Sequence, residues 1–329
     1  MPKLNKIDET DANILKALLK DSRTSFTEIA RTCNVSVPAI RVRYKSLQEA
    51  GVINGAIMQL NPERLGFKCV GDIGIITVTD REEKVMEFLK TKPFITLIMG
   101  SWGKYNIGAF FVLPDIQQLG HALEEIEANP YIKQADVLIW TNPVNVDHPE
   151  NLIIKPLPKA KQTERLQRTM ETIENRKLDD TDRAIARILS KHSRMPFSEV
   201  AKQLNITTKT VIQRYHKLRK QNVFTLSTIT IDLCKLGYKA TGHFFIKAIN
   251  KSRIPEIYAE VYSIPNVIVI IRTIGAYDMH VMVPLEDLDD LLRLTKQVRR
   301  IKHVEKTEIY AIYPYRKWPA NLFEGLLGL

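Results

Sequence analysis

Basic side chains recur in two stretches of the sequence, residues 31–45 and 202–220. Lys and Arg can neutralise DNA phosphates and so release bound counterions. Small, hydroxyl and amide side chains near the start of a helix can reach base edges in the major groove. The candidate contacts are Arg31, Ser36, Val37, Pro38, Arg41, Val42, Arg43, Lys45, Lys202, Thr207, Thr208, Lys209, Thr210, Gln213, Arg214, Lys217 and Lys220.

Residues 24–53 predict the two short helices that would position the first set. One helix is expected from Phe26 to Cys33, and a second begins after Ser36, whose hydroxyl can cap it. Pro38 is tolerated there, because the first amides of a helix have no helical partner. Gly51 is expected to end the second helix. The same pattern also fits a helical hairpin of a larger core with a solvated basic face.

The chain repeats itself, which favours the first interpretation. Lys6-Ile-Asp-Glu-Thr-Asp11 reappears as Lys177-Leu-Asp-Asp-Thr-Asp182, and Leu65-Gly66 reappears as Leu236-Gly237, at an offset of 171 residues. Further along the chain the offset becomes 172. Such self-similarity indicates a tandem duplication, and each copy is too long to be a helix-turn-helix alone.

The two copies differ at the start of the second helix. Val37-Pro-Ala39 is apolar and suits thymine methyl groups, whereas Thr208-Lys-Thr210 can form hydrogen bonds. Gln213 is a candidate for reading adenine. We therefore expect two different half-sites and an operator that is not a perfect palindrome. An alternative is that one of the two copies has lost DNA binding and only packs.

Composition sets the broad class. Lys and Arg number 48 against 37 Asp and Glu, so the formal net charge is +11, and the 44% of hydrophobic residues can bury cores of normal size. This basic balance favours a polyanionic partner. Cys33, Cys69 and Cys234 do not match between the copies, which predicts no disulfide framework and a reducing, cytoplasmic location. No apolar run is long enough for a membrane span, so no membrane partner is expected.

After each helix-turn-helix the pattern changes to alternating strands and helices in the order βαββαβ, a ferredoxin-like unit. The expected fold class is α+β, with two winged helix-turn-helix domains and two βαββαβ domains. Residues 52–60 are expected to form a pair of short strands, the wing. An open sheet edge or face would pair with the other copy, which the same chain supplies.

The expected boundaries follow from these patterns. They are winged helix-turn-helix 1 at 1–62, α/β domain 1 at 63–141, a linker with a charged helix at 142–176, winged helix-turn-helix 2 at 177–233, α/β domain 2 at 234–313 and an apolar tail at 314–329. The linker is expected to be extended over residues 142–158. The tail is expected to pack on its own domain or to contact a second chain.

These residues resemble a known family. The Ser-x-x-x-Ile-Arg-x-Arg-Tyr-x-x-Leu helix at 36–47, with a wing and a βαββαβ domain that carries a Gly-x-Tyr-Asn/Asp turn, is similar to the Lrp/AsnC (feast/famine) transcriptional regulators. The resemblance covers residues 4–140 and 175–313. It implies a sequence-specific regulator without enzymatic activity, which binds double-stranded DNA and forms oligomers through its α/β (RAM-type) domains. Most members carry one copy, so this chain would be a covalent pseudo-dimer.

The resemblance also implies an effector site, commonly for an amino acid, at the glycine-bearing turns. The residues concerned are Gly103, Tyr105, Asn106, Gly275, Tyr277 and Asp278. Asn106 replaces the acidic residue of the usual pattern, so an amine would lose its charge partner there and Asp278 is favoured. A hairpin turn of this kind also needs no ligand at all.

Other chemistry is weakly indicated. The histidines at 121, 192, 216, 243, 280 and 303 are scattered without metal-ligand spacing, so no metal and no cofactor are expected. Two alternatives stay open. Siroheme decarboxylases resemble this family in fold, with paired copies, and use the α/β cleft for a tetrapyrrole. A non-catalytic assembly module could use its helix-turn-helix units for protein contacts only.

Overall fold

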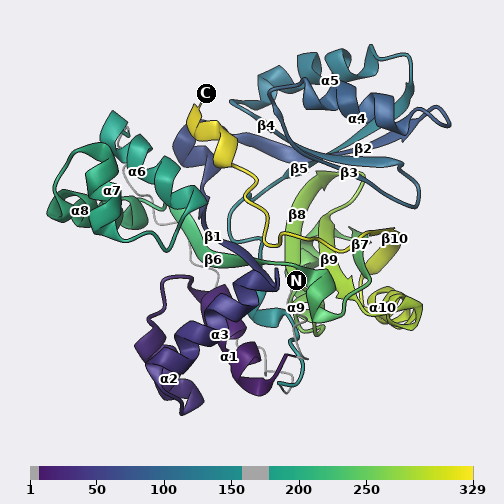
Figure 1. Ribbon diagram of the computed structural model, residues 1–329. Coiled ribbons are helices and arrows are strands. Elements are labelled where there is room, and N and C mark those ends of the chain that lie inside the picture. Colours follow the sequence, from purple (N-terminus) through teal and green to yellow (C-terminus); the bar gives the residue numbers. More distant parts are fainter. Residues whose placement is uncertain (1–6, 158–177, 329) are drawn as a thin grey trace. The chain divides into compact units, whose positions relative to one another are not determined.

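The computed structural model describes residues 7–157 and 178–328. The contacts within it divide the chain into two compact units (Figure 1). We call the first the winged-helix unit; it comprises Met1–Leu65, Pro149–Leu236 and Arg316–Leu329. We call the second the α/β unit; it comprises Gly66–His148 and Gly237–Tyr315. Each unit therefore draws on both copies of the repeat.

Three helices form the first helix-turn-helix copy: α1 (Glu9–Lys20), α2 (Phe26–Cys33) and α3 (Val37–Glu49). The Ser36 hydroxyl accepts a hydrogen bond from the amide of Ala39 and caps α3. Asn34 ends α2 in the left-handed region, at φ 53°, and so makes the tight turn. The predicted Phe26–Cys33 helix and the cap at Ser36 are confirmed.

The second copy repeats this arrangement with α6 (Asp180–Lys191), α7 (Phe197–Leu204) and α8 (Thr208–Lys220). Thr207 caps α8 by accepting from the amide of Thr210, and Asn205 makes the same left-handed turn at φ 53°. The turn and the cap that set the direction of the second helix are thus preserved in both copies.

The expected wing hairpin is wrong. Instead of two short strands, one continuous strand, β1 (Ile53–Leu60), pairs antiparallel with β6 (Phe224–Ile231) of the other copy. The ladder runs from Ile53 opposite Ile231 to Leu60 opposite Phe224. A hairpin within eight residues would leave strands too short to be stable, whereas the second copy supplies a partner of full length.

Each half of the α/β unit has the predicted order βαββαβ. The first half contains β2 (Cys69–Thr77), α4 (Glu82–Lys90), β3 (Ile95–Gly100), β4 (Ile107–Leu113), α5 (Leu119–Glu127) and β5 (Ile132–Trp140). The second half contains β7 (Ala240–Ala248), α9 (Ile254–Tyr262), β8 (Val269–Gly275), β9 (Met279–Leu285), α10 (Leu288–Arg299) and β10 (Val304–Ile312). The expected α+β fold class is confirmed.

The two halves join through their strands. The strand order is β10-β7-β9-β8-β5-β2-β4-β3, with β5 and β8 in contact where Trp140 lies opposite Thr273. A bridge between Trp102 and Ala311 repeats this contact at the equivalent place on the other half. The last strand of each half therefore meets the β-hairpin of the other, as the expected pairing between copies requires.

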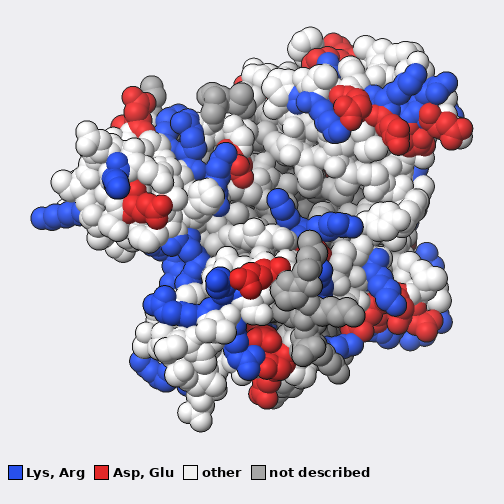
Figure 2. Space-filling view, viewed as in Figure 1, with Lys and Arg blue, Asp and Glu red and all other residues white. Residues whose placement is uncertain are grey.

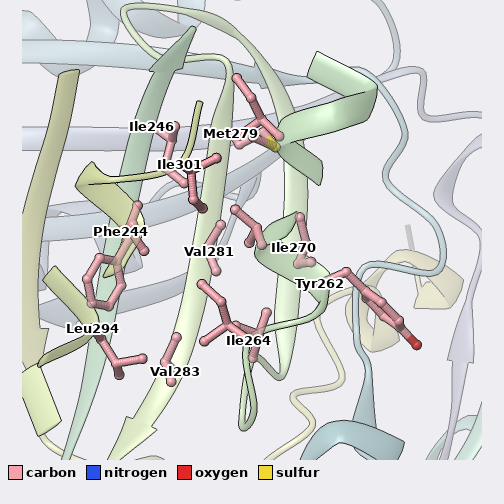
Figure 3. Close-up of a cluster of buried hydrophobic side chains, with 14 of the residues drawn as sticks. Phe244, Ile246, Tyr262, Ile264, Ile270, Met279, Val281, Val283, Leu294 and Ile301 are labelled. Carbon is pink, nitrogen blue, oxygen red and sulfur yellow. The ribbon is translucent and has the colours of Figure 1, made fainter. Parts of the chain in front are cut away.

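Alternate residues of each central strand point to opposite sides of its sheet. Phe244 and Ile246 on β7, with Val281 on β9, point toward α9 and α10 and belong to a buried apolar cluster (Figure 3). The residues on either side of Phe244 in β7, His243 and Phe245, point to the opposite, helix-free side of the sheet. On that side the two halves face each other, since Phe245 packs with Tyr105 and Leu138 of the first half.

The segment after β5 is extended, as expected, but it is not a free linker. Asp147 forms a β-bridge with Val269, and the amide of His148 donates to the carbonyl of Ile268. Leu152 is fully buried. The charged helix predicted within 159–176 lies outside the described residues, and the domain boundaries stay a prediction.

The C-terminal tail belongs to the winged-helix unit from Arg316 onward, and not to the α/β domain that it follows. Trp318 bridges to Ile231 of β6, and Trp318, Phe323 and Leu326 are buried. The tail therefore covers apolar surface beside the β1–β6 pair. Across the described parts of the chain, no helix is long and apolar enough to cross a membrane.

Candidate nucleic-acid interface and effector pocket

The outward faces of α3 and α8 carry most of the predicted DNA contacts. The exposed members are Arg31, Ser36, Pro38, Arg41, Val42 and Lys45 in the first copy, and Lys202, Thr207, Thr208, Lys209, Gln213 and Lys220 in the second. Figure 2 shows Lys and Arg on the surface of both copies, interspersed with acidic groups. Val42 is 69% exposed, although it is apolar. An apolar side chain held in water on such a helix suits contact with a base methyl group.

Four of the predicted phosphate contacts form ion pairs within the protein, and one of these pairs is the exposed Lys45–Glu49 pair at 3.5 Å within α3. Arg43 forms ion pairs with Asp8 at 2.7 Å and Asp11 at 2.9 Å. Arg214 does the same with Asp179 and Asp182, and Lys217 also pairs with Asp182, which is fully buried. The hydrogen bond from Arg214 lowers the pKa of Asp179. Arg43 thus ties α3 to α1, and Arg214 and Lys217 tie α8 to α6. The charge of these three bases is therefore largely neutralised before DNA binds. Their predicted role as DNA contacts is not tested by this geometry.

Equivalent positions on the two outward faces carry different chemistry. At the helix starts, Val37 and Pro38 correspond to Thr208 and Lys209. One turn further along α3 and α8, a charged residue in one helix corresponds to an apolar or uncharged residue in the other. The further equivalent pairs are Arg41 with Ile212, Val42 with Gln213, and Lys45 with His216. All six of these residues are exposed.

A reciprocal pair of arginines links the two copies within the winged-helix unit. The Arg23 guanidinium lies 4.1 Å from the centre of the Phe197 ring and donates to the carbonyls of Ser193 and Met195. The equivalent Arg194 lies 4.6 Å from the Phe26 ring and donates to the carbonyls of Ser22 and Thr24. We call this pair the arginine latch. Between the two arginines, the hydroxyls of Ser22 and Ser193 are 2.6 Å apart and fully buried.

The predicted effector residues have structural partners. The Asn106 side chain accepts a hydrogen bond from the Thr77 amide, and the Asp278 carboxylate accepts one from the Ala248 amide. Lys247 lies 3.7 Å from that carboxylate. Tyr105, Tyr277 and Asp278 are buried. Asn106 and Asp278 thus serve the same purpose in the two halves, which is to hold the hairpin turn to the end of the neighbouring strand.

Gly103 and Gly275 occupy equivalent positions in these turns. Both have a positive φ, of 153° and 144°, and a Cβ atom at Gly275 would lie 2.6 Å from the carbonyl oxygen of Val137. Glycine is therefore needed for the contact between halves, with or without a ligand. The effector assignment for all six turn residues stays a prediction.

The sequence analysis missed a polar chain buried within the α/β unit. His243 Nδ1 lies 2.9 Å from His280 Nε2, and His280 Nδ1 lies 2.9 Å from Asp72 Oδ2. All three residues are buried. Burial and the neighbouring His280 hold the pKa of His243 well below its usual value. The two histidines that looked scattered in the sequence are brought together because β7 and β9 pair, with His280 opposite Phe245.

The three hydrogen-bonded residues Asp72, His280 and His243 line a pocket between the helix-free faces of the two halves. The polar lining comes from Asp72, Ser101, Tyr105, Asp136, His243, His280 and Tyr310. Tyr105 donates to Asp136, which is also paired with Lys104 at 2.9 Å. Among the described residues, no group of three or more His, Cys, Asp or Glu side chains could hold a metal ion.

Comparison with known families agrees with this architecture. A winged helix-turn-helix DNA-binding model matches residues 7–54, an AsnC-type helix-turn-helix domain matches residues 178–219 and an Lrp/AsnC ligand binding domain matches residues 244–314. Two helix-turn-helix copies with a ligand-binding α/β domain define the class of DNA-binding transcriptional regulators.

Within that class, the chain belongs to the Lrp/AsnC family. It is 39% identical over 113 residues to the HTH-type transcriptional regulator LrpA of Pyrococcus horikoshii, covering 34% of this chain and 80% of that protein. It is 34% identical over 119 residues to the HTH-type transcriptional regulator Ptr1 of Methanocaldococcus jannaschii, covering 36% of this chain and 80% of that protein. These relatives thus match about one copy of the repeat.

A solved structure resembles the whole chain. The siroheme decarboxylase NirDL superposes with a TM-score of 0.64 over 97% of both chains, at 15% sequence identity. This likeness shows that the tandem fold occurs in another protein. At that identity it shows the fold alone.

Proposed function

We propose that this chain is a sequence-specific DNA-binding regulator that acts as a covalent pseudo-dimer with two non-identical reading heads. The observation that carries the proposal is that two complete helix-turn-helix copies are joined within one unit and present different exposed residues on α3 and α8. The β1–β6 ladder and the arginine latch hold the copies together. Family membership supplies the class, and this arrangement supports the finer assignment.

Phosphate binding would fall to the bases that have no acidic partner within the protein. Arg31, Lys202 and Lys209 are exposed and have no ion pair among the described residues. Lys209 is the second residue of α8, near the end of the helix where a helix that enters the major groove comes close to the DNA phosphate backbone. Base reading would then fall to Val42 and Gln213, which occupy equivalent exposed positions.

The salt dependence of DNA binding tests this proposal. Lys209→Ala is expected to weaken binding to a selected duplex and to reduce the slope of log K against log salt by about 1, because one phosphate contact is lost. Lys235→Ala removes the same charge from an exposed position in the same unit and is the matched control. Gel shifts across a salt series measure both variants.

Absence of any shift at low salt would refute DNA binding. An equal change in slope for the two lysine variants would refute the assignment of Lys209. A shift that does not respond to salt would favour a module whose helix-turn-helix copies contact only protein.

The likeness to NirDL supports a second candidate, a decarboxylase that acts on a tetrapyrrole. The acidic lining of the pocket argues against it, since Asp72 and Asp136 would repel the carboxylates of such a substrate. A visible absorption band in the purified protein, or release of carbon dioxide from an added iron uroporphyrin, would favour the enzyme over the regulator.

We also propose that a small effector modulates the regulator, as the ligand-binding domain of the family suggests. The turns around Asn106 and Asp278 are less suitable than expected, because each side chain accepts a backbone amide and the Asp278 carboxylate already has Lys247 as a cationic neighbour.

A further inference from the structure

We infer that the α/β unit contains one asymmetric pocket per chain for a small cationic amine with an apolar body. The inference deepens the effector part of the proposed function, but its evidence lies in the α/β unit alone. The site differs from the hairpin turns, because it lies between the helix-free faces of the two halves.

Two buried polar atoms of the lining lack a partner. Asp72 Oδ1 and the hydroxyl of Tyr310 make no hydrogen bond, although Asp72 is 7% and Tyr310 is 4% exposed. A buried polar group without a partner is costly, and folded proteins rarely leave one. A carboxylate oxygen and a phenol that line one pocket are therefore groups that a ligand could satisfy.

The charge of the lining sets the ligand class. The other oxygen of Asp72 is held by His280, and no Lys or Arg of the described chain pairs with Asp72. Apart from His280, no basic side chain of the described residues forms an ion pair with Asp72. An ammonium group on the ligand would supply both the charge and the missing donor.

The rest of the lining selects an apolar body. Met99, Phe110, Leu138, Phe245 and Ile312 line the pocket together with the polar groups. Gly74 and Gly108, which pair across β2 and β4, also belong to the lining on the first half. A Cβ atom at Gly74 would lie 2.5 Å from the Tyr105 ring, so glycine allows that ring to lie over the strand.

The pocket cannot be two-fold symmetric. Asp72 is equivalent to His243 in the repeat, and His280 is equivalent to Gly108. A dimer of identical chains would have the same residue at both equivalent positions, so it could not form the Asp72–His280–His243 chain. The duplication allowed the two halves to diverge, and the result is a single site with one carboxylate in contact with the histidines.

Titration calorimetry with three related probes tests the inference. Leucine and 3-methylbutylamine carry an amine on an apolar body, whereas 4-methylpentanoate has the same body without the amine. We expect 3-methylbutylamine to bind with one site per chain, leucine to bind more weakly because its carboxylate is repelled by the acidic lining, and 4-methylpentanoate to give no heat. Asp72→Asn is expected to weaken binding by about ten-fold or more. Asp80→Asn, an isosteric change at an exposed position of the same half, is expected to leave it unchanged.

Tyr310→Phe provides a second variant if Asp72→Asn fails to fold. It removes only a hydroxyl without a partner, so the free protein should keep its thermal midpoint or gain a little. The increase in midpoint that ligand binding gives to the native chain should become smaller in this variant.

No heat from any probe, equal binding of the carboxylate, or binding that survives both variants would overturn the inference. Two equal sites per chain would overturn the asymmetry. DNA binding measured without ligand tests the proposed regulator separately, so failure of one is distinguishable from failure of the other.

Discussion

Residues at equivalent positions show how the two copies have diverged while keeping the same local structure. Asn106 and Asp278 accept the same kind of backbone amide, and Arg43 and Arg214 form the same kind of ion pair. These residues preserve local structure. In contrast, the pairs Val42 with Gln213 and Asp72 with His243 differ in chemistry, and they lie on the recognition helices and in the pocket. Both of these differing pairs therefore lie where binding is proposed.

His243 should make the stability of the protein sensitive to acid. Its ring stays neutral in the folded protein because its pKa is lowered, but in the unfolded chain it binds a proton once the pH falls below about 6.5. The stabilisation is therefore present above that pH and is lost as the pH falls toward the folded-state pKa, by at most about 1.4 kcal/mol per pH unit.

Thermal unfolding from pH 7.5 to 5 measures this effect. His243→Asn, which keeps a side-chain donor but cannot titrate, should lose part of the acid sensitivity of the native protein. His121→Asn changes an exposed histidine and should follow the native curve. If all three proteins lose stability in parallel, His243 does not contribute to the acid sensitivity.

Contacts between buried polar side chains that are far apart in the chain are poorly predicted from the sequence. The histidines at 243 and 280 are 37 positions apart, and nothing in their spacing suggests contact. Their contact depends on the register of β7 against β9, and that with Asp72 depends on how the two halves pack. Ion pairs such as Arg43 with Asp8 are missed for the same reason, because charge patterns show which bases are near a helix surface but not which acids meet them.

Among the contacts between secondary-structure elements, the arginine latch joins the two helix-turn-helix copies beside the β1–β6 ladder. Arg23→Ala should destabilise the winged-helix unit by about 2 kcal/mol, because it removes a cation–π contact and hydrogen bonds to two carbonyls. Arg194→Ala should have a similar effect, since its contacts are equivalent. DNA affinity should also fall, because the heads are no longer held in one arrangement.

Urea unfolding and gel shifts measure the two consequences. Arg23→Lys keeps the charge but not the planar fork, so it should recover only part of the stability. Full recovery by Lys would show that charge, and not the geometry of the latch, is what matters. Unchanged stability in the Ala variants would show that the β1–β6 ladder alone joins the heads.

Elements with strong local signals were predicted well. The bounds of α2 agree with the sequence-based expectation, because Ser25 caps its start and Asn34 ends it in a left-handed turn. The wing was wrong because β1 pairs with a strand 171 residues away, and a local pattern cannot reveal a distant partner. The tail was misplaced for the same reason, since Trp318 pairs with β6.

At the scale of the whole molecule, strand pairing joins the two copies of the repeat. The strand contacts that would join two subunits occur here within one chain, both at β1–β6 and at β5–β8. The repeat, visible in the sequence, was sufficient to predict the pairing between the two α/β halves but not the β1–β6 pair. Further assembly of these pseudo-dimers stays a prediction that light scattering can test.

The central claim is that two unequal reading heads bind one duplex, and in vitro selection of DNA from a random pool tests it most directly. The account predicts selected sites with two different half-sites at a fixed spacing, both protected in a footprint. A strict palindrome would contradict the difference between the heads. A single protected half-site, or no enrichment of any sequence, would contradict the claim that both heads read DNA.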